Sequence, residues 1–217
     1  MLGVSYHVNQ YILLTILSYF DKIIVSTKKI GGEKVEKIST TVGVFAGILD
    51  QTTGKLLLRR RVEEDSIIPG KSFKGNWELP GGGVMDMEKI PYNHLLNELV
   101  REVDEEVGIS VSVDPMAPLY TVLFKGPAGY DLAVVTPVTT SSSPTKGETI
   151  WVSPGEIEKL AKDFAPADKK KGIDGKGIVS GHGKRMHCMA LKALSFSPNG
   201  EYAAEAKAML TEIQKGW

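Results

Sequence analysis

The feature that most constrains this chain is a glutamate-rich segment at residues 101–109, with the sequence R-E-V-D-E-E-V-G-I. Glu102, Glu105 and Glu106 stand at i, i+3 and i+4, so a helix places all three on one face. The segment therefore predicts an amphipathic helix that ends before Gly108, because glycine favours the position just past a helix end. Its apolar stripe, suited to facing a core, consists of Leu96, Leu99, Val100, Val103 and Val107.

The acidic face needs something to offset its repulsion. Like charges at i and i+4, such as Glu98 with Glu102 and Glu102 with Glu106, each cost about 0.2–0.5 kcal/mol in an isolated helix. A divalent cation would offset this cost, and carboxylate oxygens suit Mg²⁺ or Mn²⁺ rather than zinc. The alternative is a solvated surface, the usual setting of a glutamate-rich helix face. Arg101 beside the first glutamate and the glycine run at 81–83, where backbone can approach a metal or phosphate, favour the cation.

Together these residues resemble the Nudix box, G-x5-E-x7-R-E-U-x-E-E-x-G-U, in which U is a bulky aliphatic residue. The second half of the box is complete from Arg101 to Ile109. In the first half, Gly82 and Glu88 keep the box spacing, but twelve residues rather than seven separate Glu88 from Arg101. At the usual spacing the glutamate position is held by Asn93. The simplest account is a five-residue insertion before the helix, which leaves the role of Glu88 open.

The resemblance implies an α/β fold, a Nudix-type α/β/α sandwich around a mixed β-sheet. It implies hydrolysis of a nucleoside diphosphate linked to another group, with Mg²⁺ or Mn²⁺ as cofactor. Carried over from the family, the metal ligands are the Gly82 carbonyl and the carboxylates of Glu105 and Glu106. Glu102 is a further ligand or the general base, and Arg101 orients it. Arg101, Glu102 and Glu105 are thus the expected catalytic residues.

Other side chains have weaker cases. In some Nudix enzymes the base lies outside the box, and Glu148 is the candidate here, although a surface carboxylate is its simpler interpretation. Glu98 is expected to pair with Arg101 rather than to bind metal. The arginines at 59–61 alternate faces on a strand, so at most one or two can reach a phosphate and the rest belong to a solvated edge. Three aromatic residues could stack on a base, although core packing is the simpler expectation: Phe73, Trp77 and Tyr130.

Composition narrows the class of partner. The chain has 217 residues, of which 26 are basic and 26 acidic, so no overall field attracts a membrane or nucleic acid. The resemblance implies a small nucleotide as the partner, and a homodimer is left open. The single cysteine, Cys188, excludes an intrachain disulfide and fits a reducing cytoplasm. The apolar segment at 11–20 is too short to cross a bilayer, so we expect a soluble cytoplasmic protein.

Hydrophobic patterns predict an N-terminal extension at 1–36 and one Nudix hydrolase domain at 37–217. A capping box at 153–156 predicts the start of a helix that runs to Phe164. A mobile loop is expected at 165–184, and two further helices at 185–195 and 201–214. Strands are expected at 41–49, 55–62, 77–79, 110–113, 119–124, 130–138 and 149–152.

Two functions of other classes are compatible with this fold. One is a non-catalytic nucleotide-binding module, against which the complete set of three box glutamates argues. The other is an isomerase acting on a prenyl diphosphate, which would be expected to use a catalytic cysteine and further metal-binding histidines. Cys188 lies far downstream in an apolar helical pattern, and His182 and His187 lack a partner at metal-ligand spacing. The hydrolase is therefore the preferred interpretation.

Overall fold

The computed structural model describes residues 39–62, 72–83, 92–113, 120–126, 129–168, 170–178 and 185–215. Several sequence predictions fall outside these ranges, among them the extension at 1–36, Glu88 and His182. The side chains of Asn93 and Tyr130 are likewise outside the described set. The division into an extension and one domain therefore stays a prediction.

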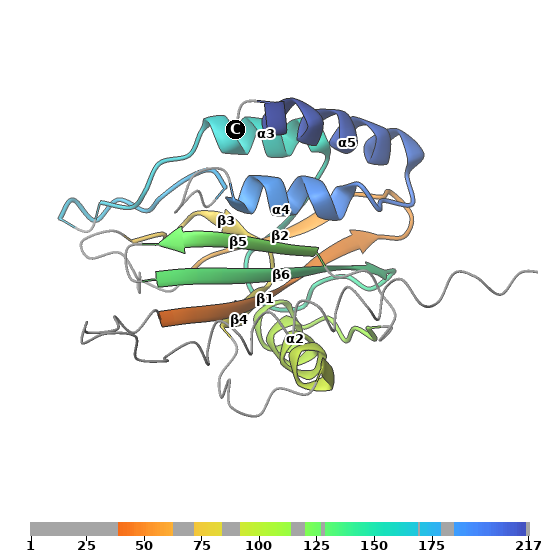
Figure 1. The fold of residues 1–217 in the computed structure, drawn as a ribbon, viewed down its shortest axis with the longest axis horizontal. Coiled ribbons are helices and arrows are strands. Elements are labelled where there is room, and N and C mark those ends of the chain that lie inside the picture. The colour runs from red at the N-terminus through yellow and green to blue at the C-terminus, as the bar shows by residue number, and fades with distance from the viewer. Residues whose placement is uncertain are drawn as a thin grey trace, which may run out of the picture. The chain divides into compact units, whose positions relative to one another are not determined.

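A mixed β-sheet forms the middle layer of the described fold (Figure 1). Strand β1 runs parallel to β6 along its whole length, whereas the other pairings of the named strands are antiparallel. The order is β3-β2-β1-β6-β5, with β4 paired to β1 and β7 paired to β2. The strands are β1 Ser39–Asp50, β2 Leu56–Arg60, β3 Trp77–Glu78, β4 Gly81–Gly83, β5 Tyr120–Gly126, β6 Gly129–Thr140 and β7 Thr149–Val152.

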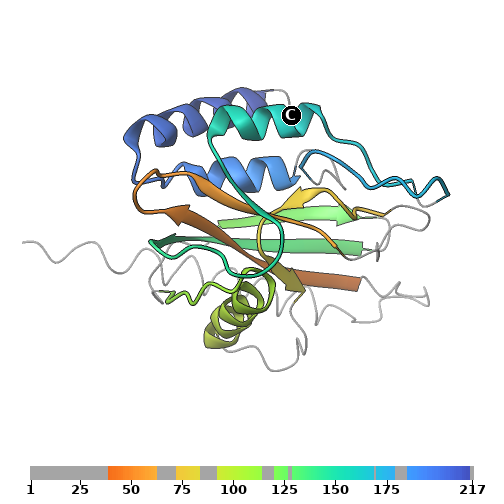
Figure 2. The same ribbon diagram turned by 180° about the vertical axis from the view of Figure 1, so that it is seen from behind.

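Helices cover both faces of this sheet. Helix α2 (Tyr92–Val107) lies on one face, and α4 (Arg185–Leu194) lies on the other. Seen from behind, α3 (Pro154–Lys162) and α5 (Gly200–Lys215) pack over the outer side of α4 (Figure 2). The predicted α/β/α sandwich around a mixed sheet is confirmed. None of the helices in the described ranges is both long and apolar enough to cross a membrane.

The two faces of β2 serve different layers. Leu56 and Leu58 belong to the core beneath α4, together with Leu191 and Leu194 of that helix. Because side chains alternate along a strand, Arg59 has the opposite orientation and faces the α2 side. The apolar stripe of α2 packs on that side, as predicted, with Leu96, Leu99, Val103 and Val107 buried.

Helix ends follow local signals in the chain. Helix α2 ends at Val107, and Gly108 has φ +64°, the left-handed conformation expected of a residue that closes a helix. At the start of α3, the Ser153 side chain accepts a hydrogen bond from the Glu156 amide, and the Glu156 carboxylate accepts one from the Ser153 amide. The predicted capping box is confirmed, and the helix is two residues shorter than expected, ending at Lys162.

The strand predicted at 110–113 is wrong, because residues 108–113 are in no strand. Ile109 and Val111 are nevertheless buried. Alternating burial thus produced a strand-like pattern without a paired neighbour.

The described part of the loop predicted at 165–184 is tied to a neighbouring segment. The Asn76 side-chain amide donates to the carbonyl oxygens of Ala165, at 3.0 Å, and Lys176, at 2.5 Å. Trp77 pairs with Ile178 in an isolated parallel bridge. These bonds place the loop beside β3, an arrangement that its glycine-rich composition did not suggest.

Candidate active site

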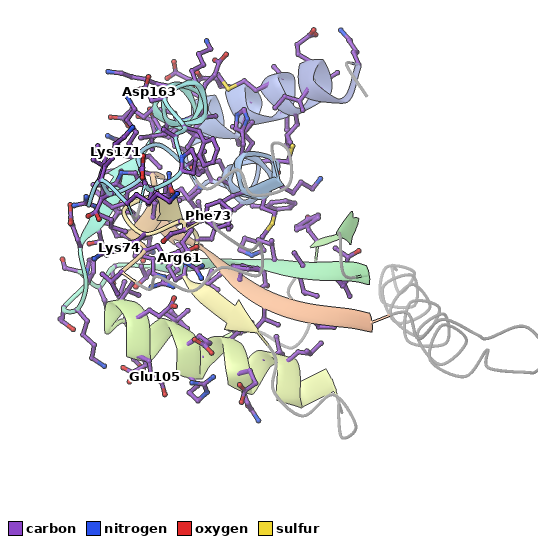
Figure 3. All side chains as sticks on the ribbon, turned by 90° about the vertical axis from the view of Figure 1, so that its left-hand side faces the viewer. Arg61, Phe73, Lys74, Glu105, Asp163 and Lys171 are labelled. Atoms are coloured by element: carbon purple, nitrogen blue, oxygen red, sulfur yellow. The ribbon has the colours of Figure 1, made fainter. Side chains whose placement is uncertain are left out.

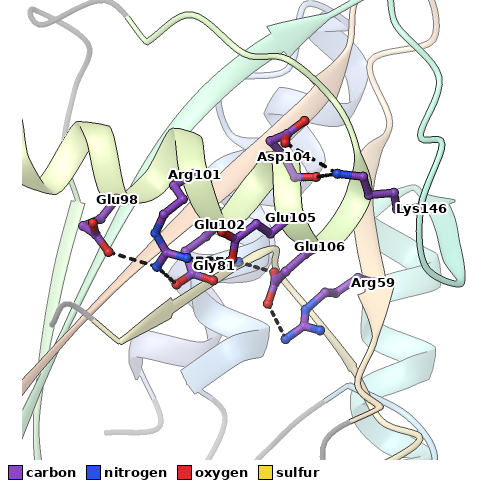
Figure 4. A network of polar contacts seen from close by, with 9 residues as sticks. All are labelled: Arg59, Gly81, Glu98, Arg101, Glu102, Asp104, Glu105, Glu106 and Lys146. Carbon is purple, nitrogen blue, oxygen red and sulfur yellow. Dashed lines mark hydrogen bonds and ion pairs between the residues drawn. The ribbon is translucent and has the colours of Figure 1, made fainter.

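The acidic face of α2 lies against the glycine strand β4 (Figure 4). The Gly81 amide donates to Glu106 Oε2 at 2.8 Å. A Cβ added at Gly82 would lie 2.8 Å from the carboxyl carbon of Glu102, which is too close for an ordinary contact. Backbone without side chains is therefore what lets both carboxylates reach this strand.

Arg101 links three glutamates of α2. Its Nη2 atom donates to Glu98 Oε2 at 3.0 Å and to Glu102 Oε1 at 2.5 Å, while Nη1 donates to Glu105 Oε2 at 2.6 Å. The hydrogen bonds that Arg101 donates to Glu98 and Glu105 raise the pKa of Arg101 above its ordinary value. The expected Glu98–Arg101 pair is present, and Arg101 contacts Glu102 as an orienting residue would.

The glutamates of this helix differ in how far their side chains are exposed to solvent. The side chains of Glu98, Glu102 and Glu106 are 17%, 15% and 12% exposed, whereas that of Glu105 is 57% exposed. Glu105 thus lies on the outer side of α2 (Figure 3). Within the ranges that the structure describes, no three Asp, Glu, His or Cys side chains are grouped closely enough to hold a metal ion. The predicted ligand set, with Gly82, therefore stays a prediction.

Sequence reasoning named Arg59 only as one of three arginines that could reach a phosphate, and it did not predict that the Arg59 guanidinium pairs with the carboxylates of this site. Its Nη2 atom lies 2.6 Å from Glu106 Oε1 and 2.7 Å from Glu78 Oε1. Arg61, on the same face of the chain, reaches the other Glu78 oxygen from Nη1 at 3.0 Å. Arg59 thus belongs to no solvated strand edge. The signal for it was weak, since the partner strand of β2 cannot be read from the sequence.

The surroundings of Glu106 disfavour its negative charge. Burial raises the pKa of Glu106 to about 8, and the nearby carboxylates of Glu78 and Glu102 act in the same direction. The positive charge of Arg59 and the hydrogen bond from Gly81 act in the opposite direction. Added positive charge beside Glu106 would therefore stabilise its ionised form.

The structure does not bring Glu148 to these carboxylates. Glu148 pairs with Arg60 Nη1 at 2.9 Å and is mostly exposed. Because Arg60 follows Arg59 on β2, its side chain points to the opposite face of the sheet. Arg60 Nη2 also lies 3.4 Å from Asp174 Oδ2, on the loop that follows α3. Glu148 is therefore found where the simpler interpretation, a surface carboxylate, expects it.

The aromatic candidates divide between core and surface. Trp77 packs against the core beneath α4, which is the simpler of its two expectations. Phe73 is half-buried, and Figure 3 labels it with its chain neighbour Lys74. Cys188 is half-buried on α4, across the sheet from the glutamates of α2. The thiol of Cys188 therefore lies outside the candidate site.

A separate segment closes the last turn of α2. The amides of Thr145 and Lys146 donate to the Val107 carbonyl at 3.0 and 3.2 Å, and Lys146 Nζ donates to the Asp104 carbonyl at 2.7 Å. The Val107 carbonyl at the helix end has no partner within the helix and requires an outside donor, whereas the Asp104 carbonyl also accepts from the Gly108 amide at 3.0 Å. The positive charge of Lys146 also suits the negative end of the helix dipole. The segment at 145–146 therefore contacts both the first and the last residue of the turn that carries Glu106.

The sequence profile of the NUDIX domain matches residues 39–171, which is more than half of the chain. The chain belongs to the Nudix family. The matched region contains the strands of the sheet, helix α2 with its glutamates and helix α3. The predicted family and the predicted enzyme class, a Nudix pyrophosphohydrolase, are thereby confirmed.

Individual relatives are more distant. A MutT-like protein of Streptomyces ambofaciens is 28% identical over 122 residues, covering 55% of this chain and 70% of that protein. The crystal structure of a MutT protein from Methanosarcina mazei Go1 is 28% identical, with a TM-score of 0.45, covering 58% of this chain and 85% of that one. The NUDIX domain of Shewanella oneidensis NrtR, solved with ADP ribose, is 15% identical, with a TM-score of 0.42, covering 64% and 86%.

The donor atoms of this Nudix chain fit a divalent cation. Glu102 and Glu106 offer carboxylate oxygens, and β4 offers backbone carbonyls, which are the hard ligands that Mg²⁺ and Mn²⁺ prefer. The Glu102 carboxylate lies close to the Gly82 backbone.

Proposed function

We propose that this chain is a divalent-metal-dependent hydrolase that cleaves the pyrophosphate linkage of nucleoside di- or triphosphates or of nucleotide derivatives. The observation that carries the proposal is the convergence of Glu102 and Glu106 on the glycine strand β4. Two partly buried carboxylates beside bare backbone are a poor site for a phosphate by themselves, because like charges repel. They become a suitable one when a cation is shared between protein and substrate.

Mg²⁺ or Mn²⁺ would be held by the carboxylates of Glu102, Glu105 and Glu106 and by the Gly82 carbonyl. A bound divalent ion offsets the charge of the pyrophosphate and polarises its phosphorus–oxygen bonds. Glu105 faces outward and is paired with Arg101, so its participation requires a side-chain rotation. Glu106 needs none, because it already faces β4.

Glu102 is the residue we assign as general base. It would accept a proton from the water that attacks phosphorus, and Arg101 contacts its Oε1 atom. Arg101 holds the carboxylate in one orientation, which a base needs if it is to meet its water at hydrogen-bond distance. Glu148 is the alternative base, and its exposed pairing with Arg60 argues against it.

The test is metal-dependent hydrolysis across a nucleotide panel, including nucleoside triphosphates, oxidised dGTP, ADP-ribose and dinucleoside polyphosphates. Glu106→Gln is assayed beside the wild type, with Asp104→Asn as the matched control on the same helix. We expect cleavage with Mg²⁺ or Mn²⁺ that Glu106→Gln loses and Asp104→Asn retains. Cleavage that persists in Glu106→Gln would contradict the site.

The second candidate is a Nudix module that binds nucleotides without cleaving them. The outward position of Glu105 is the observation that favours it. Nucleotide binding measured by calorimetry, with no product from any member of the panel at either metal, would establish this alternative. A small-molecule nucleotide partner and a cytoplasmic location remain predictions under both functions.

A further inference from the structure

We infer that Arg59 is a positioning residue for Glu106, holding one oxygen of its carboxylate while the Gly81 amide holds the other. The inference rests on the proposed function, because the orientation of Glu106 matters to catalysis only if Glu106 takes part. It does not extend to contact with substrate. Arg59 is 9% exposed and acts through the carboxylate that it touches.

Two elements hold the Glu106 carboxylate from different sides. Arg59 Nη2, at the end of β2, lies 2.6 Å from Oε1, and the Gly81 amide of β4 donates to Oε2 at 2.8 Å (Figure 4). Fixing both oxygens fixes the plane of the carboxylate as well as its position. Each oxygen keeps a second lone pair, so the group can still accept another ligand.

Arg59 is itself held by a carboxylate from another strand. Its Nη2 atom lies 2.7 Å from Glu78 Oε1, and the Arg61 guanidinium contacts Glu78 Oε2 at 3.0 Å. Residues 59 and 78 are direct partners in the β2–β3 register, so the sheet sets the distance between them. The result is a continuous chain from Arg61 through Glu78 and Arg59 to Glu106.

This arrangement depends on a guanidinium. Nη2 carries two protons and lies within hydrogen-bond distance of both Glu78 and Glu106. A lysine ammonium at the same place is a compact point charge on a flexible stem, so it would hold the two carboxylates in a less fixed geometry. Arg59 therefore sets an orientation as well as neutralising charge.

The variants must separate a positioning role of Arg59 from a role in stability alone. Arg59→Met alone leaves Glu78 and Glu106 buried against each other without their shared cation, so that variant can fail to fold. Arg59→Met/Glu78→Gln removes the cation and one carboxylate together and leaves the charge balance of the cluster unchanged. The matched control is Arg60→Met/Asp174→Asn, which removes the two ion pairs that Arg60 forms with Glu148 and Asp174 on the other face of the sheet.

The experiment measures Mn²⁺ affinity by electron paramagnetic resonance without nucleotide, together with kcat and KM on the best substrate of the panel. For Arg59→Met/Glu78→Gln we expect Mn²⁺ affinity and kcat each to fall by about 10- to 100-fold, the usual effect of losing a residue that orients a metal ligand. KM for the nucleotide should change by less than about threefold, because Arg59 does not touch substrate. Glu78→Gln alone should fall between wild type and the double variant, because its new amide oxygen can still accept from Arg59, and the Arg60→Met/Asp174→Asn control should stay near wild type.

Two results would overturn the inference. One is a folded Arg59→Met/Glu78→Gln variant whose Mn²⁺ affinity and kcat match those of Glu78→Gln. The other is a full return of both quantities in Arg59→Lys/Glu78→Gln, since charge without the guanidinium geometry would then suffice. If the wild type cleaves no nucleotide, the proposed function fails, and the Mn²⁺ titration by itself still decides whether Arg59 positions Glu106.

Discussion

Arg59 and Arg60 are neighbours on β2, and each forms an ion pair with a glutamate. Arg59 is 9% exposed and contacts Glu106 of α2, whereas Arg60 is 34% exposed and contacts Glu148 before β7. The residue types and the short distances are similar, so the difference lies in the face of the strand and its access to water. A buried pair is hard to break because the remaining charge has no water to solvate it, while an exposed partner is simply rehydrated.

The largest expected effect is a loss of turnover in which the glutamates of these two pairs differ. Glu106→Gln keeps the side-chain shape but removes the negative charge, and turnover should fall by about 100-fold or more. Glu148→Gln should retain most of its activity, because its carboxylate lies on the other face. Steady-state hydrolysis with Mg²⁺ or Mn²⁺ measures both, and circular dichroism checks that each variant is folded. A larger loss in Glu148→Gln would transfer the role of general base to Glu148.

The second prediction compares the stability lost when each arginine is replaced. Arg59→Met should lower the free energy of unfolding by about 3–5 kcal/mol, because Glu78 and Glu106 remain buried without a shared cation. Arg60→Met should lower it by about 0–1 kcal/mol, as expected of an exposed pair. Urea denaturation followed by circular dichroism gives both values. Equal losses would show that burial is not what separates the two sides of β2.

A third prediction concerns the glycine strand that the buried pair faces. In Gly82→Ala the new Cβ would press on the Glu102 carboxylate, and turnover should fall by about 10- to 100-fold through misplacement of that group. Gly83→Ala is the matched control, since a Cβ at Gly83 meets nothing within 4 Å. If both variants kept their activity in the hydrolysis assay, close approach of helix and strand would be unimportant.

The smallest expected effect is at the end of α2. Lys146→Met removes one of the two donors to the Asp104 carbonyl and the positive charge near the helix terminus, and should lower the free energy of unfolding by about 0.3–1 kcal/mol. Thermal unfolding at low and high salt measures the loss, which should shrink as salt screens the charge. A salt-independent loss would assign the effect to packing of the lysine stem.

Features that depend on residues close together in the chain could be predicted from the sequence. The end of α2 at Gly108 and the capping box at the start of α3 follow from side chains within one helical turn. The pairing of Glu98 with Arg101 is of the same kind. The strand expected at 110–113 failed because a period of two reports burial, which a segment can reach without a neighbouring strand.

The sequence by itself determined the family and the acidic face of α2, because both are properties of one contiguous segment. Only the tertiary structure decided which glutamates of that face meet the rest of the molecule. Glu106 lies against β4 and Arg59, whereas Glu105, on the same helical turn, faces outward. The reason is that strand register and helix orientation place charges together across long stretches of chain, and local spacing carries no information about either.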